Sequence, residues 1–339
     1  MAGTPEARGL PGRPRAVRAT GFGEGGRRFV EEYRVEAAMA VALVLLGAGL
    51  TLAAPNFLSA GNLRNVLWQV TAIGIIAIGQ TLVILTGGID LSVGGIAALS
   101  AMVGGLAMTR GGGQEVALGI VVTLVVGTAV GLVNGLLVAY GRLAAFIVTL
   151  GMLSITNSMT YVISDAKSLV GLPKAYRIWG RGTLGGVPYS TITFVALFVL
   201  GYLLLARTKP GRFLYAIGSN EEAARLSGVN VRAYKVLPYA ITGLLCAIAA
   251  LILSGKLGAI DPDTGTGFEL RTIAAVVIGG TSLFGGKGSL VGTLIGVFLI
   301  GVLSNGLNLL RVDAFWQGTA VGIVIILSVL VERVFRRRA

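Results

Sequence analysis

The chain has 339 residues, of which 54% are hydrophobic and only 13% are charged, and its mean hydropathy is +0.83. These values exclude an ordinary soluble protein of this size. The net charge of +13 does not indicate a nucleic-acid partner, because the arginines concentrate in the tails that flank the apolar part of the chain. Histidine is absent and Cys246 is the single cysteine, which removes most zinc sites, catalytic triads and proton relays, and any internal disulfide.

The apolar residues gather in stretches near the length that crosses a bilayer. We therefore expect an all-α integral membrane protein with about ten transmembrane helices, some interrupted by glycine. The expected spans are 36–54, 67–86, 91–109, 115–139, 144–164, 190–206, 237–255, 270–285, 289–309 and 314–331.

Charge placement predicts how the chain sits in the membrane. Residues 1–35 read as a disordered, Arg/Gly-rich cytoplasmic tail, 36–332 as the membrane domain with a cytoplasmic loop at 207–236, and 333–339 as a second basic tail. An even number of spans puts both termini on the same side, and the cytoplasmic side is expected because this orientation places most Lys and Arg inside. The longest external loops, 165–189 and 256–269, are either docking sites for a soluble partner or plain connectors.

Glycine has two distinct uses in the spans. Gly127, Gly131 and Gly135, and then Gly292 and Gly296, recur every fourth residue, a spacing that favours close helix packing within the chain over a dimer contact. The clusters at 87–95 and 279–288 instead interrupt apolar segments. Broken helices at matching places in two halves are typical of a transport path. The predicted break residues are Gly87, Gly88, Gly279 and Gly280, with Asp90 as a cap for a helix that starts at Leu91.

The span centres are almost free of charge, so no proton or sodium coupling is evident, which argues against a secondary transporter. The polar groups that remain are neutral and suit a hydroxyl-rich solute better than an ion or an amino acid. Bonding between helices is the alternative interpretation for each of them. The residues predicted for a translocation path are Gln80, Thr81, Asn134, Thr149, Asn157, Asn305 and Asn308.

A short helix signal at 220–227 lies between spans. Ser219 and Glu222 match a capping box, and Gly228 supplies a left-handed stop. Basic residues surround this segment, and a two-turn helix is marginal alone. We therefore expect it to dock on a partner.

The sequence contains two patterns that resemble nucleotide-binding motifs, but neither meets the requirements of its motif. The G-x-G-x-x-G at 21–26 follows no apolar strand, and the stretch around Gly286 and Lys287 lacks the first glycine and the hydroxyl residue of a phosphate loop. No nucleophile and base are paired, so the chain is predicted to be no enzyme, with no cofactor or metal of its own.

Several segments together resemble the permease subunits of bacterial ABC sugar importers of the ribose/xylose/galactoside type. The strongest is TKPGRFLYAIGSNEEAARLSG at 208–228, and the others are 79–84, 87–94, 134–135, 146–151, 269–275, 277–282 and 305–308. The resemblance covers about 36–332. The chain departs from it at Ala145, where relatives usually carry proline before Phe146, a residue that the resemblance adds to the predicted path.

The resemblance implies a multi-pass protein of the bacterial plasma membrane, with ATP and magnesium held by separate ATP-binding subunits. It also implies a second permease copy, identical or not, and an extracytoplasmic sugar-binding protein. The cargo would be a ribose-, xylose- or galactose-like monosaccharide. The alternative cargoes are a nucleoside, a furanose signal and a branched-chain amino acid. The alternative of another class is a stand-alone secondary transporter. The residues implied in coupling to the ATPase are Gly211, Arg212, Gly218, Ser219, Asn220, Glu221, Glu222, Ala223, Ala224, Arg225 and Gly228.

Overall fold

The computed structural model describes residues 34–109, 115–313, 316–320, 322–323 and 326. The chain divides into two units, Met1–Arg34 and Val35–Ala339, and the second holds the fold. The predicted tails, residues 1–33 and 333–339, and most of the predicted span 314–331 lie outside the described residues.

Seven of the described helices are long and apolar enough to cross a membrane. They confirm the predicted all-α membrane fold, with starts that differ most for the second and seventh predicted spans. Their bounds are α2 (Arg34–Ala53), α3 (Ala60–Leu85), α5 (Val116–Ala139), α6 (Ala145–Ser164), α8 (Tyr189–Arg207), α11 (Val231–Leu257) and α13 (Leu290–Leu309).

Two further apolar helices are short. α4 (Val93–Thr109) begins only after an irregular segment at 86–92, and α12 (Phe268–Ile278) stops well before residue 285, where the sequence had placed its end. Glycines explain both breaks, because Gly87 and Gly280 adopt φ of 77° and 90°, which helical L-residues do not. The chain is therefore non-helical at 86–92 and 279–289, whereas Gly94 and Gly95 of the first predicted interruption lie inside α4.

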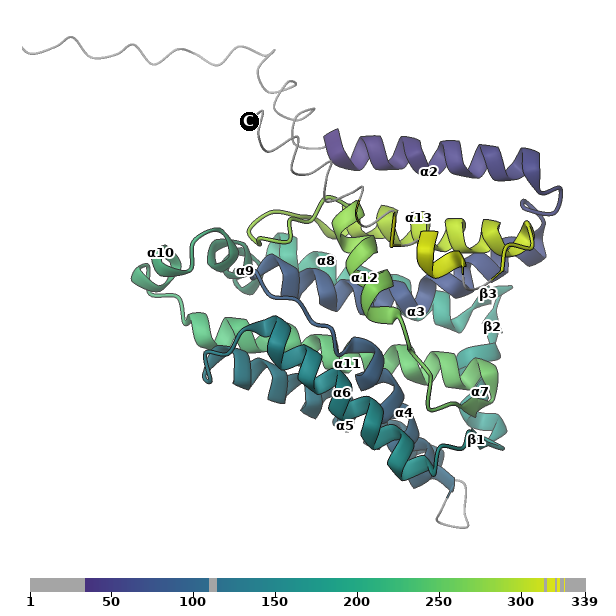
Figure 1. Ribbon diagram of the computed structural model, residues 1–339, viewed down its shortest axis with the longest axis horizontal. Coiled ribbons are helices and arrows are strands. Elements are labelled where there is room, and N and C mark those ends of the chain that lie inside the picture. Colours follow the sequence, from purple (N-terminus) through teal and green to yellow (C-terminus); the bar gives the residue numbers. More distant parts are fainter. Residues whose placement is uncertain (1–33, 110–114, 314–315, 321, 324–325, 327–339) are drawn as a thin grey trace, which may run out of the picture. The chain divides into compact units, whose positions relative to one another are not determined.

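The core of the bundle is built around α3 and α11, which run through the middle of Figure 1 and pack against each other. Ile75 and Ile76 of α3 are fully buried, and so is Cys246 of α11. By contrast α2 lies at one edge, and its outer residues such as Val44 and Leu52 are exposed, as suits a lipid-facing helix.

The predicted glycine stripe works inside the chain. α5 packs on α11, with Gly127 and Gly131 facing the backbone of Gly243 and of Tyr239. A side chain at either α5 position would strike main-chain atoms, so the stripe sets how closely the two helices approach. The second pair, Gly292 and Gly296, faces α12 in the same way.

The two long loops predicted outside the membrane join each other. β1 (Leu169–Val170) pairs antiparallel with β4 (Ala259–Ile260), and Ser168 donates a hydrogen bond to Asp261 at 2.7 Å. α7 (Lys174–Arg181) and the hairpin of β2 (Thr183–Leu184) with β3 (Val187–Pro188) complete this end. The loops are thus a folded layer rather than plain connectors.

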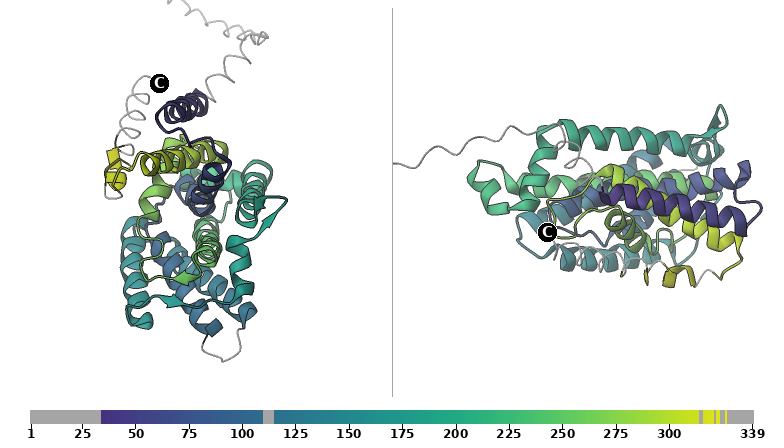
Figure 2. Two further views of the ribbon diagram at one scale, coloured as in Figure 1. Left: turned by 90° about the vertical axis from the view of Figure 1, so that its right-hand side faces the viewer. Right: turned by 90° about the horizontal axis from the view of Figure 1, so that it is seen from above.

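At the opposite end, two short helices connect α8 to α11. These are α9 (Lys209–Ser219) and α10 (Glu221–Leu226), and Figures 1 and 2 show them projecting at the end of the bundle away from β1 and α7. The sequence segment 208–228, which carries the strongest resemblance, folds into these two helices.

Candidate functional site

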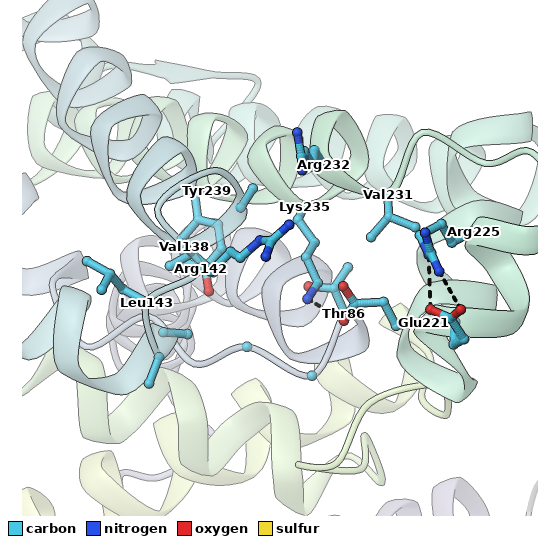
Figure 3. A pocket seen from close by; sticks show the side chains of 16 residues that line it. Thr86, Val138, Arg142, Leu143, Glu221, Arg225, Val231, Arg232, Lys235 and Tyr239 are labelled. Carbon is cyan, nitrogen blue, oxygen red and sulfur yellow. Dashed lines mark hydrogen bonds and ion pairs between the residues drawn. The ribbon is translucent and has the colours of Figure 1, made fainter.

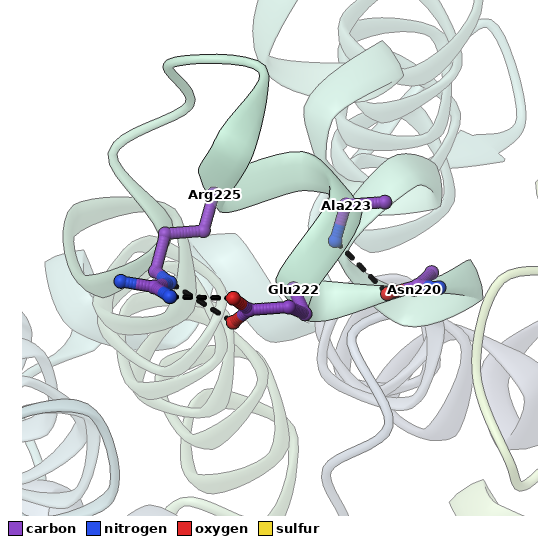
Figure 4. A network of polar contacts seen from close by, with 4 residues as sticks. All are labelled: Asn220, Glu222, Ala223 and Arg225. Carbon is purple, nitrogen blue, oxygen red and sulfur yellow. Dashed lines mark hydrogen bonds and ion pairs between the residues drawn. The ribbon is translucent and has the colours of Figure 1, made fainter.

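Asn220 caps the N-terminus of α10, and the predicted capping box is wrong. The side-chain oxygen of Asn220 accepts a hydrogen bond from the backbone N–H of Ala223 at 2.9 Å (Figure 4), and the backbone of Asn220 is extended. Ser219 is the last residue of α9, so its helical backbone does not suit a cap. Glu222 does not reach back either, because its carboxylate binds Arg225.

The C-terminus of α10 ends as predicted. Gly228 has φ of 82°, its N–H donates to the carbonyl of Arg225 at 3.0 Å, and the next N–H, of Val229, donates to Ala224 at 3.1 Å. This pair of bonds is the Schellman arrangement, which satisfies carbonyls that the helix end would otherwise leave free.

α10 sits on the protein through one face. Ala224 is buried in a small apolar cluster with Ile217 of α9 and Val231 of α11, separate from the main core. Lys235 of α11 pairs with Glu221 at 2.5 Å, which ties the start of α10 to the next membrane helix. Glu221 therefore has a structural partner and is less available to another protein than its position in the sequence indicated.

The outer face of α10 presents two charges and one large apolar side chain. Glu222 and Arg225 form an exposed pair, and the hydrogen bond from Arg225 holds the pKa of the Glu222 carboxyl below its ordinary value. Leu226 is 76% exposed. The sequence reading missed Leu226, although a period of 3.6 residues places it opposite the buried Ala224.

α9 approaches the main chain of its neighbours closely. Gly218 faces the carbonyl of Leu85, at the end of α3, and the N–H of Gly286; that N–H donates to the Leu85 carbonyl at 3.0 Å. Gly211 faces the backbone of α8 in the same manner, whereas Arg212 is exposed. The break after α3, the break after α12 and the helix α9 therefore meet at one junction, which we call the glycine junction (Leu85, Gly218 and Gly286).

Asp90 does not cap a helix at Leu91, because α4 begins at Val93. Its carboxylate accepts hydrogen bonds from the backbone N–H of Ser92 at 2.8 Å and from the Ser92 hydroxyl at 2.6 Å. Asn134 of α5 donates to the same hydroxyl at 2.8 Å. Asp90 is fully buried, so it is an ionisable group inside the bundle that the sequence reading had placed at a span end.

The residues predicted for a path lie in separate places. Gln80, Thr81, Asn134 and Thr149 are fully buried; Thr81 bonds Thr293, and Thr149 donates to the carbonyl of Ile89. Asn305 pairs with Asn62. Asn157 is half-buried, whereas Asn308 and Phe146 are exposed, with Asn308 accepting from Gln317. Most of these contacts are bonds between helices, and a path role for the set stays a prediction.

A cavity of about 790 Å³ opens beside α10. Its walls come from the segment 86–88, the turn between α5 and α6, α10 itself and the first turns of α11 (Figure 3). None of the predicted path residues lines it. The predicted coupling residues Glu221, Glu222 and Arg225 do.

Long apolar helices, glycine-broken segments inside the bundle and a small capped helix outside it define a multi-pass membrane protein of the transporter-subunit class. The described residues hold no group of three or more acidic, Cys or His side chains placed to bind a metal ion. The chain belongs to the family described as the permease component of branched-chain amino acid transport systems, whose model matches residues 62–329.

Individual relatives have narrower names. The chain is 46% identical over 282 residues to the ribose import permease protein RbsC of Bacillus subtilis, covering 82% of this chain and 87% of that protein. It is 42% identical to the RbsC of Escherichia coli K12, covering 91% and 97% of the two chains. It is 39% identical to the fructose import permease protein FrcC of Rhizobium meliloti, covering 84% and 81%.

Proposed function

We propose that this protein is the membrane-spanning permease subunit of an ATP-driven importer for a monosaccharide. The observation that carries the proposal is the identity of 46% and 42%, over most of both chains, to proteins named as ribose import permeases. The family model describes branched-chain amino acid systems more broadly, but the named relatives quoted above import sugars.

ATP hydrolysis is assigned to a separate cytoplasmic ATP-binding subunit, and α10 to the contact with it. The support is geometric: α10 is fixed to its own chain by Ala224 and Glu221, while Glu222, Arg225 and Leu226 point outward. An apolar side chain with a charged pair beside it matches the apolar centre and polar rim of a protein–protein contact. This assignment places α9 and α10 on the cytoplasmic side and the β1–β4 layer on the outside.

The same arrangement assigns a role to the outer layer. The folded loops at 165–189 and 256–269 would receive an extracytoplasmic sugar-binding protein, which selects the cargo. A second permease copy would complete the path, because the exposed sides of α5 and α6 carry apolar residues that either lipid or a partner helix must cover.

The substitution Leu226→Ser tests the role of α10. Serine removes the apolar contact without unfolding α10, since the residue is exposed. We expect ATP-driven ribose uptake into proteoliposomes to fall at least tenfold, and the ATPase to be lost when the tagged chain is purified from its membranes.

Leu58→Ser is the matched control, since it makes the same change in an exposed leucine of the turn between α2 and α3, outside α10 and outside both folded loops. It should leave uptake and co-purification unchanged. Full co-purification and coupled uptake in Leu226→Ser would contradict the assignment of α10 to the contact with the ATP-binding subunit. Uptake driven by an ion gradient without ATP would instead overturn the importer class.

A further inference from the structure

The cavity beside α10 has the size and the lining of a small-molecule site. Its volume of about 790 Å³ lies within the range of roughly 300–1,000 Å³ that such sites occupy. Apolar side chains such as Val138, Leu143 and Val231 form part of the wall, and charged groups gather on the side of α10 and α11. Glu222 and Arg225 belong both to this wall and to the surface assigned above to the ATPase, whereas the enclosed space has no role in that assignment.

The charged lining has an excess of positive groups. Arg142, Arg225, Arg232 and Lys235 face Glu221 and Glu222 around the cavity. Arg225 and Lys235 are each engaged by one of these carboxylates. Within the described residues, Arg142 and Arg232 make no ion pair; Arg232 only lies over the ring of Tyr140, 5.6 Å from its centroid. The cavity therefore favours an anion.

Tyr239 adds an aromatic side chain to the wall. Its side chain is 1% exposed, it lines the cavity, and its hydroxyl makes no hydrogen bond within the described residues. Buried hydroxyls in folded proteins nearly always have a partner. A side chain at position 88 would run into this hydroxyl, so the hydroxyl packs against Gly88 and is closed off from the cavity.

We propose that this cavity binds the phosphate monoester of a small sugar. Two guanidinium groups that lack a carboxylate partner are the groups that proteins use for phosphate, which they bind through paired N–H donors. The apolar wall would cover the carbon face of the ring.

The proposal gives the ligand a regulatory effect, which rests on the proposed function. A ligand in the cavity contacts the α5–α6 turn, α10 and α11 together, so it resists any movement of α10 against the bundle. On the cytoplasmic side it would reduce further uptake. The reaction that supplies the ligand is a phosphoryl transfer to the imported sugar.

The first experiment measures binding to the full-length chain in phosphatidylcholine nanodiscs by calorimetry. Ribose 5-phosphate should bind, and ribose should not. Arg142→Gln and Arg232→Gln should each weaken binding about tenfold, the size expected for one charged hydrogen bond. Tyr239→Phe should leave binding unchanged, because the hydroxyl that it removes has no surface accessible from the cavity. Arg64→Gln, an equal charge change at the far end of α3, should have no effect.

Two results would overturn the proposal. One is ribose 5-phosphate binding no tighter than ribose; the other is Arg64→Gln weakening binding as much as Arg142→Gln. Nanodiscs that contain phosphatidylglycerol separate the sources of phosphate. If that lipid abolishes sugar-phosphate binding to the original chain, the site belongs to a lipid headgroup and the sugar-phosphate assignment is wrong.

A second experiment links binding to transport and separates the two proposals. Proteoliposomes with the complete transporter are loaded with ribose 5-phosphate on the side of α10, and ATP-driven uptake is compared with empty vesicles. We expect at least a fivefold reduction that Arg142→Gln relieves. No uptake in empty vesicles would contradict the proposed function, whereas normal uptake in loaded ones would contradict the regulatory effect alone.

Discussion

Single residues decide how the contact helix α10 begins and ends. The sequence pattern placed the N-terminal cap at Ser219, one residue too early, because Ser219 and Glu222 have the S-x-x-E spacing of a capping box. The structure shows α9 running through Ser219, so the first residue with an extended backbone is Asn220, and a capping side chain needs that backbone. The end was predictable, because only glycine takes φ of 82° readily and Gly228 stands directly after the helix signal.

Gly228→Ala should loosen α10. An L-residue at this φ costs about 1–2 kcal/mol, and no neighbouring atom lies close enough to compensate. We expect faster hydrogen exchange of the amides in 221–229, measured by mass spectrometry, together with reduced ATP-driven uptake. Gly151→Ala is the control, because that helical glycine is exposed, has ordinary φ and has open space around it. Unchanged exchange in Gly228→Ala would show that the left-handed stop does not hold the helix.

Asp90 shows where residue patterns mislead. An acid next to an apolar stretch reads as a cap at the edge of a span, but the chain continues as irregular backbone into the bundle before α4 starts. The carboxylate then satisfies the free N–H of Ser92 at that break. Nothing in the local sequence reveals that α5 supplies Asn134 to the same cluster, because that contact joins residues far apart in the chain.

At the scale of elements, helices were predictable and their partners were not. Hydropathy located the long spans, but it merged α12 with the turn that follows, since residues 279–285 carry no charge to mark the end of a span. The pairing of β1 with β4 escaped prediction entirely, because each strand has only two residues and the register depends on loops from opposite halves of the chain. The partners of the predicted path residues were equally unpredictable, because several of these residues bond to segments far away in the chain.

The β1–β4 layer should weaken at acid pH. The N–H of Asp263 and then the hydroxyl of Ser168 hold the pKa of the Asp261 carboxyl below its ordinary value. A depressed folded-state pKa gives stability above the unfolded value, near 3.9, and that stability is lost as the pH falls through the folded value. The effect is small because water screens the group. Hydrogen exchange of residues 168–171 and 258–263, corrected for intrinsic rates, should rise from pH 6 to pH 3.

Asp261→Asn provides the control for this titration. Its amide oxygen still accepts a hydrogen bond but does not ionise, so the change between pH 6 and pH 3 should disappear. An equal rise in this variant would show that another group controls the layer.

For the whole molecule, the arrangement joins the outer face of α10 to the inside of the bundle through α9. The predicted breaks at 87–95 and 279–288 were read from glycine content alone, and sequence gave no sign that they touch each other. In the structure Gly286 donates to the last carbonyl of α3, and Gly218 of α9 lies against both. Force applied at α10 therefore reaches both broken segments through one packed contact.

The glycine junction also limits which substitutions the protein tolerates. At Gly218 every close neighbour is main chain, so Gly218→Ala should abolish uptake and no side-chain replacement at the contact should restore it. Gly74 gives the opposite case, because the three atoms nearest to a methyl group there belong to the ring of Phe194, and Gly74→Ala should regain function when Phe194→Leu is added. A screen for second-site revertants under selection on the sugar should yield position 194 for Gly74→Ala and, for Gly218→Ala, only true reversion.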